Sequence, residues 1–247
     1  MTQYIILGII QGLTEFFPVS SSAHLVIAQR LFGMQENQLA VSIILHLGTI
    51  AALLVFFWRD IIETMFKPKL ILFIILVTAI TAIIGISGKD FFEGLFSEVV
   101  PAAAALIVTG VILILTAGFA TAKRDNVNLK DGFILGIAQG LAVIPGISRS
   151  GITISTLLFR GINPIAAFRV SFLASIPAVL GAVLLEAKEI NLVLKGNFSG
   201  LTAGFFCSLF TGLIALWVLK LILRRAKLYY FGYYCIAAAI ITLIFIR

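Results

Sequence analysis

Apolar residues fill six long stretches of the chain, each about 18 to 24 residues in length. A helix rises about 1.5 Å per residue, so a stretch of this length matches the roughly 30 Å hydrocarbon core of a bilayer. The pattern therefore predicts six membrane-spanning helices. They are Leu39–Trp58, Lys69–Ile86, Val99–Phe119, Pro164–Leu185, Ser199–Ile222 and Leu228–Ile246.

Two shorter apolar stretches have a different form, because each runs for about ten residues into a proline and then into serines. They are Ile6–Leu25 and Ile134–Thr153, and an ungapped alignment gives nine identical residues in twenty. Each half of such a stretch is too short to cross a bilayer. Irregular backbone at membrane depth is tolerated only where protein or a wet cavity surrounds it. We therefore interpret both copies as re-entrant helical hairpins.

Three of the predicted spans lie between the two copies, so the second copy is inverted relative to the first. The predicted fold is an all-α polytopic membrane protein with six spans, forming a single integral membrane domain, 1–247. It consists of two inverted-topology repeats, 1–122 and 123–247, each with one hairpin and three transmembrane helices. An interrupted apolar segment at matching positions of two inverted halves is a typical marker of a binding site between them.

Composition agrees with this fold and excludes a soluble domain, since 61% of the 247 residues are hydrophobic and the mean hydropathy is +1.14. The net charge of +7 comes from residues in short loops, which indicates orientation and not nucleic-acid binding. Eleven Lys and Arg residues fall on one side of the predicted membrane and five on the side of the N-terminus. The positive-inside rule then places both termini outside the cytoplasm, in a plasma membrane protein.

Three charged residues remain at membrane depth in this arrangement: Glu15, Arg149 and Arg169. Charged side chains in the membrane are unfavourable and usually mark function. Glu15 and Arg149 belong to the two hairpin tips, which enter from opposite sides, so we expect them to approach each other. Arg169 lies near the start of its span and can extend its guanidinium toward the membrane surface.

The first tip brings a carboxylate, hydroxyl groups and an imidazole to one helix start. Gln11 and Glu15 are four residues apart and share a helix face. A proline at position 18 ends that helix, and Ser20, Ser21 and Ser22 suit the N-cap of the returning helix. His24 follows one turn later and can lean back toward the serines. One Glu and one Gln also suit a single Mg²⁺ or Ca²⁺ ion whose other ligands are phosphate and water.

The second tip has the residues of an anion site. Ser148 and Ser150 can cap the helix, Arg149 stands at its start, and Thr153 follows one turn on. Backbone N–H groups at a helix N-terminus bind anions, and a guanidinium pairs bidentately with phosphate oxygens. Two such helix starts facing each other describe a phosphate or diphosphate site.

Simpler interpretations of the same residues stay open. The serines can be plain helix caps, and Glu15 and Arg149 can be an ion pair that only joins the hairpins. His46 has Thr49 as its one polar neighbour in the first span. We therefore expect a structural or access-path role for His46. The sequence does not fix the oligomeric state and leaves a homodimer open.

At these positions the chain resembles the undecaprenyl-diphosphate phosphatases of the bacitracin-resistance type. The resemblance rests on the segment from Gln11 to His24 and on the segment from Pro145 to Thr153. It extends to His46–Thr49, to Ser171–Pro177 and to the order of the spans.

The resemblance implies hydrolysis of undecaprenyl diphosphate, a membrane lipid, to undecaprenyl phosphate, which recycles the lipid carrier for peptidoglycan and gives bacitracin resistance. It implies that Glu15 holds metal or acts as a base, that Ser21 is a nucleophile or phosphate ligand, and that His24 is an acid or base. Ser148, Arg149 and Thr153 would bind the diphosphate.

The chain departs from that family where many relatives carry a second Glu in place of Gln11, a Gly in place of Ala23, and an acidic residue in place of Arg169. The first departure weighs against a mechanism that needs two carboxylates, although Gln still offers a carbonyl ligand. The alternative function is a polyprenyl-phosphate flippase or transporter, which needs the Arg149 site but no nucleophile with a base. Neither the attacking group nor the face to which the site opens follows from the sequence.

Overall fold

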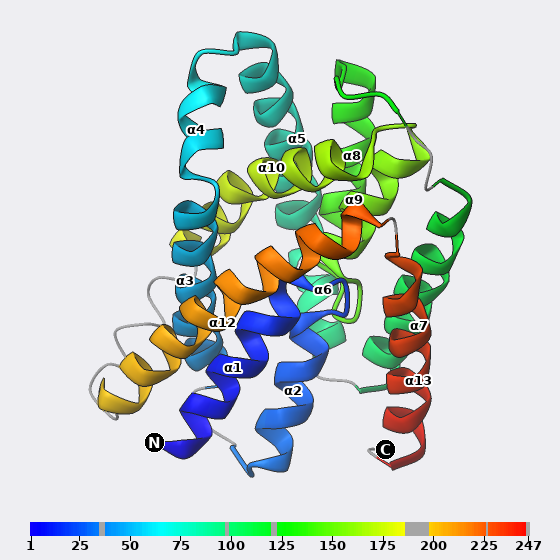
Figure 1. The fold of residues 1–247 in the computed structure, drawn as a ribbon. Helices are drawn as coiled ribbons and strands as arrows, with labels where there is room; N and C mark the ends of the chain where they lie inside the picture. Colours follow the sequence, from blue (N-terminus) through cyan, green and yellow to red (C-terminus); the bar gives the residue numbers. More distant parts are fainter. Residues whose placement is uncertain (35–37, 97–98, 120–122, 186–197, 226, 246–247) are drawn as a thin grey trace.

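The computed structural model describes the chain except for residues 35–37, 97–98, 120–122, 186–197, 226 and 246–247, and the described part is helical (Figure 1). In chain order the elements are α1 (Thr2–Phe16), α2 (Ser21–Leu31), α3 (Gln38–Phe56), α4 (Trp58–Met65), α5 (Pro68–Ser87), α6 (Lys89–Phe96), α7 (Val99–Leu115), the 3₁₀ helix η1 (Thr116–Phe119), α8 (Leu129–Leu141), α9 (Arg149–Phe159), α10 (Pro164–Leu185), α12 (Phe198–Arg224) and α13 (Tyr229–Phe245).

Each copy of the repeated segment forms a helix, a break and a returning helix, as predicted. The first is α1–α2, and its break contains Ser20 in a left-handed conformation with φ 65°. The second is α8–α9, and its break contains Gly146 with φ 95°, where a Cβ would lie 2.0 Å from the carbonyl oxygen of Ala102. The four arms have 15, 11, 13 and 11 residues. At about 1.5 Å per residue they are shorter than the hydrocarbon core.

The longer helices define a multi-pass membrane protein. Four described helical segments are long and apolar enough to span, namely Pro68–Ser87, Val100–Phe119, Pro164–Leu185 and Phe198–Arg224. A fifth is added if α3 and α4 count as one span, and α13 is an apolar helix below the length required of a span. The number of six spans stays a prediction.

The predicted span Leu39–Trp58 differs from the structure at its end. α3 stops at Phe56, and the axis of α4 is bent by 68° from that of α3. The residue at the bend, Phe57, is buried against Phe168 and Phe172 of α10, with ring centroids 5.3 and 5.9 Å away. Burial of this ring at the bend turns α4 toward α10.

The turn of α4 also gives Arg169 two acidic partners that the sequence analysis did not foresee. Its Nε lies 2.5 Å from an Asp60 oxygen, and its Nη2 lies 2.7 Å from a Glu63 oxygen. Both acids belong to α4. Arg169 is therefore ion-paired within the protein and need not reach the membrane surface by itself.

Glycines let each hairpin pack closely on a long helix from the other half of the chain. A Cβ at Gly12 of α1 would lie 2.5 Å from the Ser208 carbonyl oxygen of α12, and one at Gly8 would lie 2.3 Å from that of Gly204. In the second copy, a Cβ at Gly140 of α8 would lie 2.7 Å from Ile84 of α5. The start of α1 and the end of α13 lie at the same end of the molecule (Figure 1).

The second hairpin is fixed at its base by a buried carboxylate. Asp131 closes a capping box with Asn128 at the start of α8, and its oxygens lie 2.9 Å from nitrogens of Arg124 and Arg160. Burial by itself would raise the pKa of the Asp131 carboxyl. The hydrogen bonds from Arg124, the Asn128 backbone and Arg160 outweigh burial and hold that pKa below its usual range.

We expect Asp131→Asn to lower the free energy of unfolding at pH 7 by about 2 to 3 kcal/mol, because hydrogen bonds between charged groups are lost. A carboxylate with a depressed folded-state pKa stabilises the fold above its unfolded pKa, about 3.9, and loses this contribution as the pH falls through the lower, folded-state value. Denaturation in detergent at several pH values measures both effects. The control Lys67→Met breaks an exposed pair with Glu63 and should change stability by less than about 0.5 kcal/mol. An equal loss of stability in the two variants would contradict the stabilising role of Asp131.

Candidate active site

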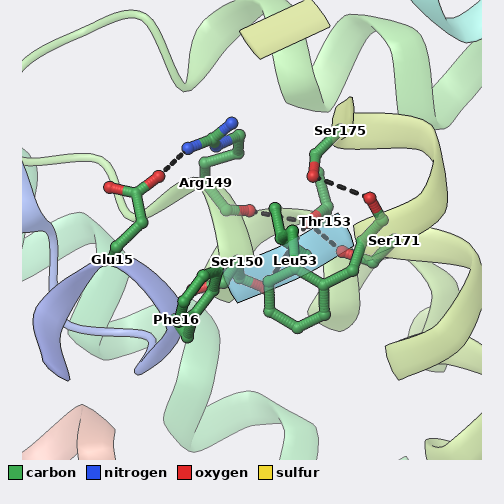
Figure 2. Close-up of a pocket in the computed structure, with 9 residues that line it drawn as sticks. Glu15, Phe16, Leu53, Arg149, Ser150, Thr153, Ser171 and Ser175 are labelled. Carbon is green, nitrogen blue, oxygen red and sulfur yellow. Dashed lines mark hydrogen bonds and ion pairs between the residues drawn. The ribbon is translucent and has the colours of Figure 1, made fainter. Parts of the chain in front are cut away.

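A small pocket lies where the tip of the first hairpin meets the second hairpin, α3 and α10 (Figure 2). Predicted site residues and unforeseen ones share its wall. The lining residues are Glu15, Phe16, Leu53, Arg149, Ser150, Thr153, Ser171, Phe172 and Ser175.

Glu15 is the centre of the polar contacts, and its side chain is only 5% exposed. Its Oε1 pairs with Nη2 of Arg149, so the predicted approach of the two tips is confirmed (Figure 2). Its Oε2 accepts a hydrogen bond of 2.6 Å from Ser21 Oγ and one of 3.0 Å from Gln11 Nε2. A hydroxyl that donates to a carboxylate at this distance can act as a nucleophile with the carboxylate as its base.

The start of α9 holds Arg149 in place through the backbone. Ser148 is the N-cap and accepts from the Gly151 N–H at 3.2 Å, as predicted, while its own N–H donates to Thr109 Oγ1 at 3.0 Å. Ser150 Oγ donates to the Phe17 carbonyl at 3.3 Å and so joins the two tips. Since Arg149 is the first residue of α9, its guanidinium stands beside the positive end of the helix dipole.

Thr153 continues the polar wall of the pocket onto α10. Its Oγ1 donates to the Arg149 carbonyl at 2.6 Å, and it lies 2.6 Å from Ser171 Oγ. Ser175, one turn after Ser171, donates to the Phe172 carbonyl at 2.8 Å. Neither serine is among the site residues predicted from the sequence. Two hydroxyls four residues apart, in the apolar stretch of α10 that follows Arg169, are the signal that would have indicated them.

The other predicted residues of the first tip point elsewhere. Ser20 is the N-cap of α2 without a side-chain capping bond, and its Oγ lies 3.1 Å from that of Ser22. His24 leans back as expected, with Nδ1 2.8 Å from the Ser20 carbonyl oxygen, but its Nε2 lies 2.7 Å from the Tyr234 hydroxyl of α13. The two rings stack with centroids 5.8 Å apart. The catalytic role of His24 stays a prediction.

The imidazole beside Glu15 belongs to His46 of α3, which the sequence analysis gave a structural or access-path role. Its Nε2 lies 3.4 Å from Glu15 Oε2, and its Nδ1 lies 2.8 Å from the Ser42 carbonyl oxygen. The expectation that Thr49 is its one polar neighbour was therefore wrong. The polar residues at 42, 46 and 49 share one helix face. That spacing is the feature of the sequence that could have indicated a polar contact for His46.

The donors around Glu15 provide a partial set of metal ligands. Among the described residues no group of three His, Cys, Asp or Glu side chains is arranged to hold an ion. Gln11 Oε1, however, is buried without a hydrogen-bond partner one turn from the Glu15 carboxylate. A carboxylate and an amide oxygen fit Mg²⁺ or Ca²⁺ if substrate oxygens and water complete the shell.

Fold and site together define a multi-pass membrane protein with a buried, ion-paired polar site between two helical hairpins. The chain matches the family model described as bacitracin resistance protein BacA over residues 4–241, and it belongs to that family. Curated proteins named undecaprenyl-diphosphatase are similar over nearly their whole length. The one from Carboxydothermus hydrogenoformans is 44% identical, over 94% of this chain and 92% of its own. That from Halothermothrix orenii is 41% identical, over 97% and 96%.

The contact between Glu15 and Arg149 predicts a strong coupling between the two residues. Arg149→Met leaves a buried carboxylate without its cation and should lower the free energy of unfolding by about 3 kcal/mol. Glu15→Gln in the same chain should recover part of that loss, with a coupling energy of about 1 to 3 kcal/mol. Denaturation of the two single variants and the double variant in detergent measures this energy. Arg149→Met combined with the distant Lys67→Met should be additive, and additivity for Glu15 and Arg149 would contradict a direct pair.

Proposed function

We propose that the protein hydrolyses undecaprenyl diphosphate to undecaprenyl phosphate and inorganic phosphate, and thereby recycles a lipid carrier for peptidoglycan synthesis and gives resistance to bacitracin. The observation that carries the proposal is that Glu15 contacts both Ser21 and Arg149. One carboxylate thus connects a hydroxyl nucleophile to a phosphate-binding cation. The names of the curated relatives support the same activity.

Ser21 is the proposed nucleophile and Glu15 its base. The Ser21 oxygen attacks the terminal phosphorus, a bond from Oγ to phosphorus forms, and the bond from phosphorus to the bridging oxygen breaks. The hydroxyl proton passes to Glu15 across the 2.6 Å hydrogen bond, and undecaprenyl phosphate leaves. Water then hydrolyses the phosphoserine and releases inorganic phosphate. Direct attack by water is the alternative, which a trapping experiment separates.

The second hairpin supplies the proposed anion site. Arg149 has five N–H donors, so one guanidinium can face both Glu15 and a phosphate oxygen. Ser148, Ser150 and Thr153 surround it at the start of α9, where backbone dipoles favour negative charge. Stabilising negative charge on the transferred phosphoryl group is the main catalytic requirement in phosphoryl transfer.

The remaining residues of the first tip have proposed secondary roles. Ser20 and Ser22 bind substrate oxygens near the start of α2. His24 is the second acid or base, and it reaches the substrate only after its contact with Tyr234 is given up. This requirement makes the α2–α13 contact part of the proposed reaction path.

A divalent ion, Mg²⁺ or Ca²⁺, is the proposed cofactor, held by Glu15 and Gln11 together with substrate oxygens. When bound, it would neutralise negative charge on the diphosphate. Arg149 and Glu15 cancel each other, so the charge of a diphosphate needs a further cation. The unpartnered Gln11 oxygen supports this assignment.

We also propose the finer membrane arrangement: six spans and two re-entrant hairpins in inverted repeats, in the plasma membrane, with both termini outside the cytoplasm. The matched glycine contacts of α1 with α12 and of α8 with α5 support two equivalent halves. The start of α1 and the end of α13 lie at one end of the molecule, which supports a common side for the two termini. The unequal distribution of Lys and Arg supports the orientation.

The test is release of phosphate from undecaprenyl diphosphate by the purified protein in detergent, with and without Mg²⁺ or Ca²⁺. We expect cation-dependent release, reduced about 100-fold or more in Glu15→Ala, Arg149→Ala and Ser21→Ala. The control Ser87→Ala removes an exposed hydroxyl that bonds only to its own helix backbone, and should keep full activity.

Two outcomes would change the mechanism or the function. Phosphate labelled in the terminal position should be trapped on Ser21 after acid quench, and its absence during turnover would favour direct attack by water. Folded protein that binds the lipid but releases no phosphate would contradict the enzyme and favour a polyprenyl-phosphate carrier.

A further inference from the structure

We propose that His46 is a positioning residue, which keeps the Glu15 carboxylate directed at Ser21 while Arg149 engages the substrate phosphate. The inference rests on the proposed function and assigns a role within that site to a residue of α3. It starts from the unequal distribution of contacts over the two Glu15 oxygens.

Arg149 approaches Oε1 of Glu15, whereas Ser21, Gln11 and His46 approach Oε2. A guanidinium pairs bidentately with a carboxylate or with a phosphate. Arrival of a diphosphate therefore draws Arg149 away from Glu15, or draws the flexible Glu15 side chain along with it. In either case the 2.6 Å contact of Oε2 with Ser21 depends on what else holds Oε2.

His46 holds that oxygen from an element outside both hairpins. Gln11 and Ser21 belong to the first hairpin, and Arg149 belongs to the second. Among the described polar side chains that contact Glu15, only His46 lies on an element that belongs to neither hairpin. Its ring connects the Ser42 carbonyl, 2.8 Å from Nδ1, to Glu15 Oε2, 3.4 Å from Nε2.

The helix that carries His46 is itself fixed on both sides of the residue. Ser208 Oγ of α12 donates to the Leu45 carbonyl at 2.8 Å. A Cβ at Gly48 would lie 2.5 Å from the Phe205 carbonyl oxygen, so the backbones of α3 and α12 are in close contact there. The imidazole therefore projects toward Glu15 from a rigid segment, which is the property a positioning residue needs.

The test compares His46→Leu with His46→Gln in the phosphate-release assay. Leu keeps the bulk and removes the donor, whereas Gln keeps an N–H donor near the position of Nε2. We expect His46→Leu to lower kcat by about 10- to 100-fold with KM changed by less than about twofold, since the interaction acts on Glu15 and not on bound substrate. His46→Gln should recover kcat to within about fivefold of the unsubstituted protein.

Thr49→Val is the matched control, because it removes a hydroxyl of the same helix that donates to the His46 carbonyl at 2.8 Å. It should keep kcat and KM. An unchanged kcat in His46→Leu, a rise in KM alone, or an equal loss of kcat in His46→Gln would overturn the proposal. The unsubstituted protein in the same assay reports separately on the proposed function.

A second measurement, the structure of the variant, does not depend on enzyme activity. The crystal structure of His46→Leu is expected to show the Glu15 carboxylate turned so that both oxygens face Arg149, with the contact to Ser21 lost. A Glu15 side chain that keeps its contact with Ser21 in that variant would overturn the positioning role even if the protein has no phosphatase activity.

Discussion

The ion pair between Glu15 and Arg149 is the interaction on which the site depends. The two residues are 134 positions apart and come from the tips of different hairpins. Neither charge is tolerable alone in an apolar interior, because an unpaired buried ion is far more unfavourable than a paired one. The pair therefore forces the two tips together, and the capped start of α9, the Ser150 bond to Phe17 and the polar wall of α10 all assemble around that meeting point.

Features that depend on local chemistry were predictable from the sequence. Apolar length, proline and serine placement located both hairpins, and two opposite charges left at depth indicated that Glu15 would approach Arg149. Partners set by helix packing were not predictable. Arg169 of α10 pairs with Asp60 and Glu63 on α4, beyond the bend at Phe57. His46 contacts Glu15 from α3, a helix that packs against both α1 and α12. His24 was placed near the serines correctly, but its contact with Tyr234 depends on the distant helix α13.

The two copies of the repeated segment have the same helix–break–helix backbone but carry different functional side chains. Their aligned glycines support close helix contacts in both halves, whereas Glu15 aligns with Val143, and Ser21 aligns with Arg149. Gln139, aligned with Gln11, donates to Thr81 and the Ala174 carbonyl and has no acid beside it in its own copy. One hairpin thus contributes an acid and a hydroxyl, and the other contributes a cation. A single copy of either kind would lack half of the proposed reaction.

The glycine contacts have a consequence for how such a chain can be divided. α1 is seated on α12, and α8 is seated on α5, so each hairpin rests on a helix encoded in the opposite half. Either half made alone would therefore leave its hairpin without the helix on which it packs. If the two halves were made as separate chains, they would have to associate before Glu15 could meet Arg149.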